Sequence, residues 1–227
     1  MQTRSEIKAT AKTMLRGHWA QGVLITLIPT LISCLTVSSA FSISRTFLSS
    51  FTSLISILVT WLMVGAAYTF LDWYCDYQRN KNFYKVEQPV IACFSIWSAE
   101  YVGGTICILL LKMLFTFLWS LLLIVPGVIK NCAYSQALFI YKEHIEAGEK
   151  VGALQCITES RQLMIGHKWE YFVYELSFVG WEILCAITFG IGFFWLNPYQ
   201  QLTYAGYFYN LKKASHKNNV VTSSDNK

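Results

Sequence analysis

The chain has 227 residues, of which 54% are hydrophobic and only 14% are charged, and its formal net charge is +5. Soluble globular domains carry about 25% charged residues, so this composition excludes an ordinary soluble domain and favours a protein that crosses a membrane several times. The positive charge does not indicate nucleic-acid binding, because the basic residues lie beside long apolar runs, where they act as topology signals.

The first eighteen residues are predicted to form a basic amphipathic helix. Lys8 and Lys12 lie beside apolar residues that recur at helical spacing, namely Ile7, Ala11, Met14 and Leu15. Such a helix before a membrane span is typical of a segment that rests on the inner leaflet, where lysine and arginine meet anionic lipid. We therefore expect anionic inner-leaflet lipids to be partners of this segment.

Six apolar segments in the rest of the chain are candidates for membrane spans. A helix needs roughly 20 residues to cross the hydrocarbon core of a bilayer. The four strongest segments comprise residues 19–40, 50–74, 102–125 and 170–190. Two weaker segments lie near Pro126 and Pro198 and comprise residues 126–143 and 194–211.

The stretch around Pro126-Gly127 decides between four and six spans. If one long helix continued outward with a kink at Pro126, six basic residues would lie outside and eleven inside. If the chain turns back there, and again in the third hairpin, fifteen of the eighteen basic residues lie inside, and the others are Arg45, Lys112 and Lys130. Basic residues concentrate on the cytoplasmic side, so we predict that the chain turns back.

Two similar segments precede the first and the third predicted hairpin, and they read AKTMLRGHW and SRQLMIGHKW. Each contains Gly-His shortly before a tryptophan at the start of a span, which indicates a weak internal repeat. Residues 151–165 also have apolar side chains at helical spacing. They are predicted to form a second amphipathic helix on the inner leaflet.

Together these features predict an all-α fold, a polytopic transmembrane helical bundle of six spans arranged as three helical hairpins with cytoplasmic amphipathic helices. Residues 1–213 are predicted to form a single transmembrane domain. The polar residues 214–227 are predicted to form a disordered cytoplasmic tail. Both termini are expected in the cytoplasm, and the protein in the plasma membrane.

The most specific stretch of the sequence runs from Ser160 to Leu211 and reads SRQLMIGHKWEYFVYELSFVGWEILCAITFGIGFFWLNPYQQLTYAGYFYNL. With IVPGVIKNCAYSQALFIY and the N-terminal AKTMLRGHW, it resembles a family of small integral membrane proteins of Gram-positive bacteria that is known only as a domain of unknown function. The resemblance covers most of the chain and implies a polytopic plasma-membrane protein. It implies no reaction, substrate or catalytic residue.

The sequence contains no nucleotide-binding loop, zinc-protease motif or nucleophile-elbow motif. Its seven cysteines include no Cys-x-x-Cys pair, so we expect free thiols and no metal site. Glu143, His144 and Glu146 bring carboxylate and imidazole groups close together, but zinc prefers histidine pairs at helical spacing, so we expect a solvated helix end there. We therefore expect no enzymatic activity, no cofactor and no nucleic-acid partner.

Charged and strongly polar residues within the predicted spans form a candidate intramembrane site. A charge at the bilayer centre costs about 2.5–3.5 kcal/mol on insertion scales, so such residues usually face protein or water and have a partner. The candidate residues are Lys112, Lys130, Asn131, Gln136, Glu175, Glu182 and Gln201. We expect them to face the bundle interior, which is either packed or holds a substrate.

Lys112 and Glu182 are predicted to form a buried ion pair. At a rise of 1.5 Å per residue, Lys112 lies roughly 15 Å from the cytoplasmic start of its span, and Glu182 lies roughly 18–20 Å from the start of its own. Both depths fall near the middle of a hydrocarbon core about 30 Å thick. Glu175 is shallower and is expected to form a hydrogen bond at the inner interface.

Two functions fit these observations. The first is a non-enzymatic accessory, envelope or interaction protein that binds an unidentified membrane protein. The alternative is a small transporter or carrier that uses the polar interior as a coupling site. A water-filled cavity that reaches Glu182 would favour the transporter, whereas a sealed, dry core would favour the accessory protein.

Overall fold

The computed structural model describes residues 3–39, 45–80, 98–122, 124–188 and 190–225, together with positions 89, 91 and 94. All regular secondary structure within these residues is α-helical, so the predicted all-α class is confirmed for this part of the chain. The single transmembrane domain stays a prediction, and the chain divides into two compact units. Unit 1 comprises Met1–Arg4, Trp97–Ser177 and Tyr207–Lys227, and unit 2 comprises Ser5–Ile96 and Phe178–Gly206.

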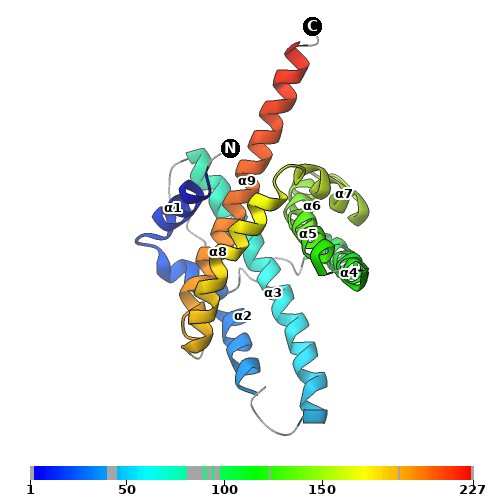
Figure 1. Cartoon of the computed structure of the whole chain (residues 1–227). Coiled ribbons are helices and arrows are strands. Elements are labelled where there is room, and N and C mark those ends of the chain that lie inside the picture. The colour runs from blue at the N-terminus through cyan, green and yellow to red at the C-terminus, as the bar shows by residue number, and fades with distance from the viewer. Residues whose placement is uncertain are drawn as a thin grey trace. The chain divides into compact units, whose positions relative to one another are not determined.

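Unit 2 is built on the first helical hairpin. Its helices are α1 (Arg4–Leu15), α2 (Trp19–Ser39) and α3 (Arg45–Asn80), together with parts of α8 (Lys168–Ile187) and α9 (Phe193–Asp225). Figure 1 shows α2 and α3 packed side by side. The predicted spans 19–40 and 50–74 therefore coincide with two helices of one hairpin.

The predicted apolar face of α1 is confirmed, but it packs against protein. Its four apolar residues are all buried, and none of them is more than 4% exposed. Ile7 lies against Gly206 of α9, and Leu15 lies against Gly22 of α2, where the missing side chains leave room for close approach. The apolar face is therefore not available to lipid, which corrects the expectation that α1 rests on the inner leaflet by this face.

The turn between α8 and α9 lies in unit 2 and reverses the chain. Gly190 adopts a φ of +86°, a left-handed conformation that glycine takes without strain. Beyond the turn, the ring centroid of Phe178 on α8 lies 5.8 Å from that of Tyr199 and 6.0 Å from that of Tyr204, both on α9. The second predicted reversal of the chain is therefore confirmed.

Unit 1 contains the helices around Pro126. They are α4 (Ala99–Leu122), α5 (Ile124–Tyr134), α6 (Ala137–Glu146) and α7 (Ala153–Leu163), together with the remaining parts of α8 and α9. Figure 1 shows α4 and α5 packed side by side. Pro126 lies in the first turn of α5, where its missing N–H leaves no hydrogen bond unmade.

The contacts of α4 show that the chain turns back. The ammonium of Lys130 lies 4.4 Å from the ring centroid of Trp119, and the ring centroids of Tyr134 and Phe115 are 6.0 Å apart. Farther from the turn, the Tyr141 hydroxyl donates a 3.0 Å hydrogen bond to the carbonyl of Glu100. Partner numbers rise as residue numbers along α4 fall, so the helices are antiparallel. The predicted reversal is confirmed, and one long helix kinked at this point is excluded.

The returning helix is interrupted at Ser135-Gln136, between α5 and α6. The carbonyl of Ala133, at the end of α5, accepts a 2.8 Å hydrogen bond from the buried hydroxyl of Ser160 on α7. The last four carbonyls of a helix have no partner within the helix, and a buried carbonyl without any partner is costly. Ser160 therefore satisfies a carbonyl beside the interruption and attaches α7 there.

The second predicted amphipathic helix is confirmed as α7, and its apolar face is also covered by protein. α7 packs against α4, α5 and α6. Its buried residues are Ala153, Cys156, Ile157 and Ser160. The expectation that residues 151–165 lie on the inner leaflet by this face is therefore corrected in the same way as for α1.

The two Gly-His segments share a local structure. Gly17 follows α1 with a φ of +87°, and Gly166 follows α7 with a φ of +81°. The next N–H in each case bonds to a carbonyl three residues earlier, at 2.9 Å for His18 and 3.2 Å for His167. A left-handed glycine is a common way to end a helix. The two segments therefore end their helices in the same way, and the internal repeat stays a prediction.

The end of the chain differs from the prediction. A disordered tail was expected at residues 214–227, whereas the structure continues α9 to Asp225. A helix that packing has already nucleated extends at little cost, because each added residue contributes one backbone hydrogen bond.

The contact between Gly104 and Tyr141 gives a test of the α4–α6 packing. A Cβ at Gly104 would overlap the Tyr141 ring, whereas a Cβ at Gly103 would meet nothing within 4 Å. We expect Gly104→Ala to destabilise the protein by about 1–3 kcal/mol, the usual cost of overpacking. Gly103→Ala should be neutral or slightly stabilising, since alanine is the better helix former. Thermal unfolding of both variants in detergent checks this, and equal unfolding temperatures would contradict the packing.

Candidate functional site

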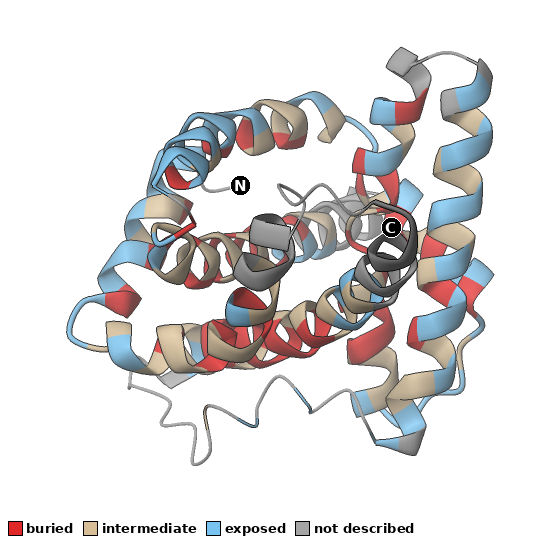
Figure 2. Cartoon of the chain, turned by 90° about the horizontal axis from the view of Figure 1, so that it is seen from below, coloured by how far each residue is buried: buried red, intermediate tan, exposed pale blue. Residues whose placement is uncertain are grey.

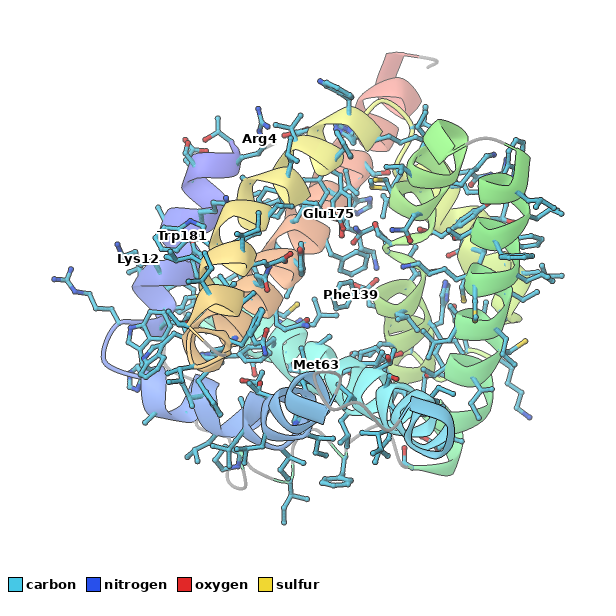
Figure 3. All side chains as sticks on the ribbon, turned by 60° about the horizontal axis from the view of Figure 1, so that its bottom comes forward. Arg4, Lys12, Met63, Phe139, Glu175 and Trp181 are labelled. Atoms are coloured by element: carbon cyan, nitrogen blue, oxygen red, sulfur yellow. The ribbon has the colours of Figure 1, made fainter. Side chains whose placement is uncertain are left out.

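Lys112, Cys132 and Glu175 come together in unit 1 from three helices. Lys112 lies on α4, Cys132 on α5 and Glu175 on α8, and each of the three interacts electrostatically with the other two. Lys112 and Glu175 are half-buried, and Cys132 is 2% exposed. Figure 3 shows Glu175 on α8. Two of the predicted site residues, with opposite charges, therefore interact electrostatically.

This arrangement differs from the predicted pair of Lys112 and Glu182. The two residues belong to different units, and Glu182 accepts a 2.7 Å hydrogen bond from the Gln200 amide within unit 2. Lys112 interacts with Glu175 within unit 1. The prediction used depth along each helix, which takes no account of helix tilt and offset and therefore does not show which glutamate lies near Lys112.

The other predicted site residues have different environments. Lys130 lies over the ring of Trp119, so its charge makes a cation–π contact. Gln201 is half-buried and Gln136 is buried, whereas Asn131 is exposed. Asn131 was expected to face the interior, and this expectation was wrong. Polarity alone does not show which side of a helix faces the core.

Two buried side-chain oxygens in the described part of the chain have no hydrogen-bond partner, and both lie near the Lys112 cluster in sequence. They are the Thr116 hydroxyl, one turn after Lys112 on α4, and the amide oxygen of Gln136, one turn after Cys132. The amide nitrogen of Gln136 donates a 2.7 Å hydrogen bond to the Ser135 hydroxyl. A buried oxygen without a partner is rare, and a bound water or ion is one explanation of it. These two oxygens are therefore candidates for a bound water or small polar group in unit 1.

A second polar site was not predicted. A pocket of about 400 Å³ lies in unit 1 between residues of α6, α7 and α9. The imidazole of His144 bridges two carboxylates in its wall, with Nδ1 2.5 Å from Glu149 and Nε2 2.8 Å from Glu159. On the α9 side, Lys212 pairs with Glu143. The apolar part of the lining includes Ile140, Leu163 and Phe208.

The charges of this pocket stabilise one another. Burial tends to lower the pKa of His144, but its hydrogen bonds to Glu159 and Glu149 outweigh burial and raise the pKa. Burial tends to raise the pKa of Glu159, but the hydrogen bonds that it accepts from His144 and Gln155 outweigh burial and lower it. Both ring nitrogens of His144 face carboxylates, which leaves neither of them free for a metal ion.

Only part of this pocket was predicted from the sequence. Glu143 and His144 were noticed, but a solvated helix end was expected. Glu149 reaches His144 through the turn at Gly148, whose φ is +75°, and Glu159 reaches it from α7. A spacing of 5 or 15 residues matches no helical or strand repeat, so no periodic signal could have found these partners.

The described structure defines a helical protein built from apolar hairpins with amphipathic helices packed on them. Two stretches of it, Ile55–Arg79 and Glu100–Trp119, are long and apolar enough to cross a membrane. The family described as protein of unknown function (DUF975) matches residues 1–132 and 121–215, and the chain belongs to this family. The predicted membership in a family of unknown function is thus confirmed. No curated protein and no solved structure matches the chain.

A double-mutant cycle tests the Lys112–Glu175 pair. Removing one partner leaves a charge without compensation, so Lys112→Leu and Glu175→Leu should each destabilise the protein. The double change should destabilise it less than the sum of the two single changes. The coupling free energy expected for interacting residues is about 0.5–3 kcal/mol, measured by thermal unfolding in detergent. The matched control is the cycle of Lys112→Leu with Glu182→Leu. A larger coupling in the control would restore the pair predicted from depth.

The bridge at His144 predicts a pH dependence. The raised pKa of His144 means that its contribution to stability is full below about pH 6.5 and is lost as the pH rises through the folded-state value. The lowered pKa of Glu159 means that its contribution is present above about pH 4.3 and is lost as the pH falls through its folded-state value. The unfolding temperature of wild type should therefore exceed that of His144→Gln by more at about pH 6 than at about pH 9. A gap that is equal or larger at the higher pH would show that the bridge is not ionic.

Proposed function

We propose that this protein is an integral plasma-membrane protein that acts without enzymatic activity, as an accessory or interaction protein. The observation that carries the proposal is an exposed apolar stripe on α4. Its residues recur at helical spacing, are each at least 39% exposed, and are Ile106, Leu110, Met113, Leu114, Phe117, Leu118 and Leu121. Exposed residues, pale blue in Figure 2, recur along this helix. A continuous apolar face of this length needs an apolar surrounding.

The low burial of α4 distinguishes a membrane helix from the core helix of a soluble protein. Only 11% of the apolar stretch of α4 is buried, compared with 44% of the apolar stretch of α3. A core helix in a soluble protein would be mostly buried, so α4 fits a lipid-facing helix. Its other side is covered by α5, α6 and α7.

Six spans were predicted, and the fuller form of the proposal keeps the first four of them, so that the first two hairpins cross the membrane and both termini lie in the cytoplasm. Each of the first four predicted spans coincides with a described helix, or with the interrupted pair α5 and α6. The distribution of basic residues supports the turns of the first two hairpins. This distribution does not test the third hairpin. Residues 183–211 contain no lysine or arginine, so the number of basic residues on each side is the same whether or not this hairpin crosses the membrane.

Two pockets in the described part of the chain favour an accessory protein over a transporter. The polar pocket at His144 is not lined by Lys112, Glu175 or Glu182, and the apolar pocket of unit 2 is not lined by them either. A coupling site for transport would need access from water. The five charged groups of the His144 pocket bind one another, which leaves no free nucleophile or base for an enzymatic reaction there.

A small transporter remains the second candidate, because one observation favours it. Transporter sites often form at interrupted helices near the bilayer midplane. The α5–α6 interruption carries the buried Gln136 with its unpartnered oxygen, and the Lys112–Glu175 pair lies in the same unit.

Charge substitutions on α4 test the membrane proposal. Phe117→Lys places a charge on the exposed stripe, which should cost about 2.5–3.5 kcal/mol if this stripe faces lipid. The amount of protein that stays in the membrane fraction after an alkaline carbonate wash should therefore fall strongly. Gln155→Lys on the exposed side of α7 is the control and should change little.

The wild-type chain provides the reference for this test. It should stay in the membrane fraction, and its release by carbonate would overturn the proposal. Affinity purification of the washed protein, followed by mass spectrometry, then separates an accessory protein from a transporter. A membrane protein that co-purifies in a fixed ratio supports the first function. Its absence together with ligand-dependent protection of Cys132 from alkylation supports the second.

A further inference from the structure

The turn between α8 and α9 is apolar, although it is predicted to lie in water outside the cell. Residues 188–198 read TFGIGFFWLNP and contain no charged residue. Ile187, Ile191 and Trp195 are 70%, 62% and 56% exposed. Turns in water are usually rich in polar residues, so an exposed apolar turn indicates an apolar surrounding.

The basic helix α1 runs along this hairpin within unit 2. Near the middle of the hairpin, the ammonium of Lys8 lies 4.1 Å from the ring centroid of Phe178. Near the turn, Gly22 at the start of α2 lies against both Leu15 and Pro198. α1 therefore follows the hairpin from its middle toward its turn.

The chain after α1 reaches the turn itself. Trp19, the first residue of α2, lines one apolar pocket of about 320 Å³ together with Gly192 and Trp195. The remaining lining residues are Trp181, Leu184, Cys185, Thr188, Leu196 and Tyr199. The predicted topology put Trp19 at the inner interface and Gly192 outside, and unit 2 places them at one pocket.

The charges of α1 exclude a hairpin that crosses the bilayer with α1 beside it. Arg4, Lys12 and Arg16 are exposed, and the only acidic residue of α1 is Glu6. If the hairpin crossed, α1 would be carried into the hydrocarbon core with these charges. Charged residues at that depth are strongly disfavoured.

We propose that the α8–α9 hairpin is re-entrant, so that it enters and leaves the membrane on the side of the N-terminus. Its apolar turn contacts the acyl chains of that leaflet, and the basic face of α1 contacts anionic headgroups. The pocket that contains Trp19, Trp181 and Trp195 lies at this level, where tryptophan is favoured because it has an apolar ring and a polar N–H. The inference rests on the membrane location proposed above and identifies the surface that meets the lipid.

Cysteine labelling in native membranes tests the position of the turn. Ile191→Cys changes an exposed side chain and should leave the fold intact. It is treated with a membrane-impermeant maleimide in intact cells and in inverted vesicles, and the labelled sites are mapped by mass spectrometry so that native cysteines can stay. Ser42→Cys and Ser223→Cys are the references for the outer and the inner side. We expect Ile191→Cys to react at least tenfold less than the matching reference on each side.

A lipid probe completes the test. Phosphatidylglycerol with a diazirine on one acyl chain should crosslink to the peptide that contains residue 191. Lys12→Glu with Arg16→Glu should reduce this crosslink severalfold, whereas Arg79→Glu on α3 should not. Labelling from outside would show a crossing hairpin, and labelling from inside only would show a turn in water. An unreactive cysteine without lipid crosslinks would show a turn buried in protein. Each of these three results overturns the proposal, and carbonate resistance of the same membranes shows separately whether the protein is integral.

Discussion

The described structure depends on one constraint: the apolar face of an amphipathic helix is buried along an apolar hairpin. In unit 2, α1 packs on α8 and α9, and in unit 1, α7 packs on α4, α5 and α6. Full burial of a large aliphatic side chain stabilises a fold by about 1.5–3 kcal/mol, so each such face outweighs many surface contacts. The same burial determines where the charged face of each helix lies, because the charged and the apolar face are opposite sides of one rigid helix.

This constraint also determines the polar sites. α7 brings Ser160 to the carbonyl that α5 leaves unpaired, and it brings Glu159 to His144. Without α7, the interruption of the returning helix would leave a buried carbonyl unsatisfied. α7 precedes α8 in the chain but packs on the hairpin before it, so an amphipathic helix does not have to pack on the helix that follows it. A left-handed glycine and a histidine then lead from α7 into the next helix, as they do after α1.

The sequence predicted the helices well and their partners poorly, for physical reasons. Helical spacing showed which side chains of α1 would be buried, but an apolar face is equally suited to lipid and to protein, and the choice depends on distant glycines such as Gly22 and Gly206. Proline and the charge distribution located the turn near Pro126. The same charge distribution could not place the last hairpin, which has no basic residue near its turn. Depth along a helix paired Lys112 with Glu182 and did not show the interaction with Glu175, since depth ignores tilt and offset.

The central claim is that α1 packs on the α8–α9 hairpin and does not lie free on the membrane surface. Photo-crosslinking of the full chain in native membranes tests it most directly, with p-benzoylphenylalanine introduced in place of Lys8, which lies over the ring of Phe178. The account predicts that irradiation joins residue 8 to the peptide that contains Phe178, within the same chain, as shown by mass spectrometry. Crosslinks of residue 8 to lipid alone would contradict it.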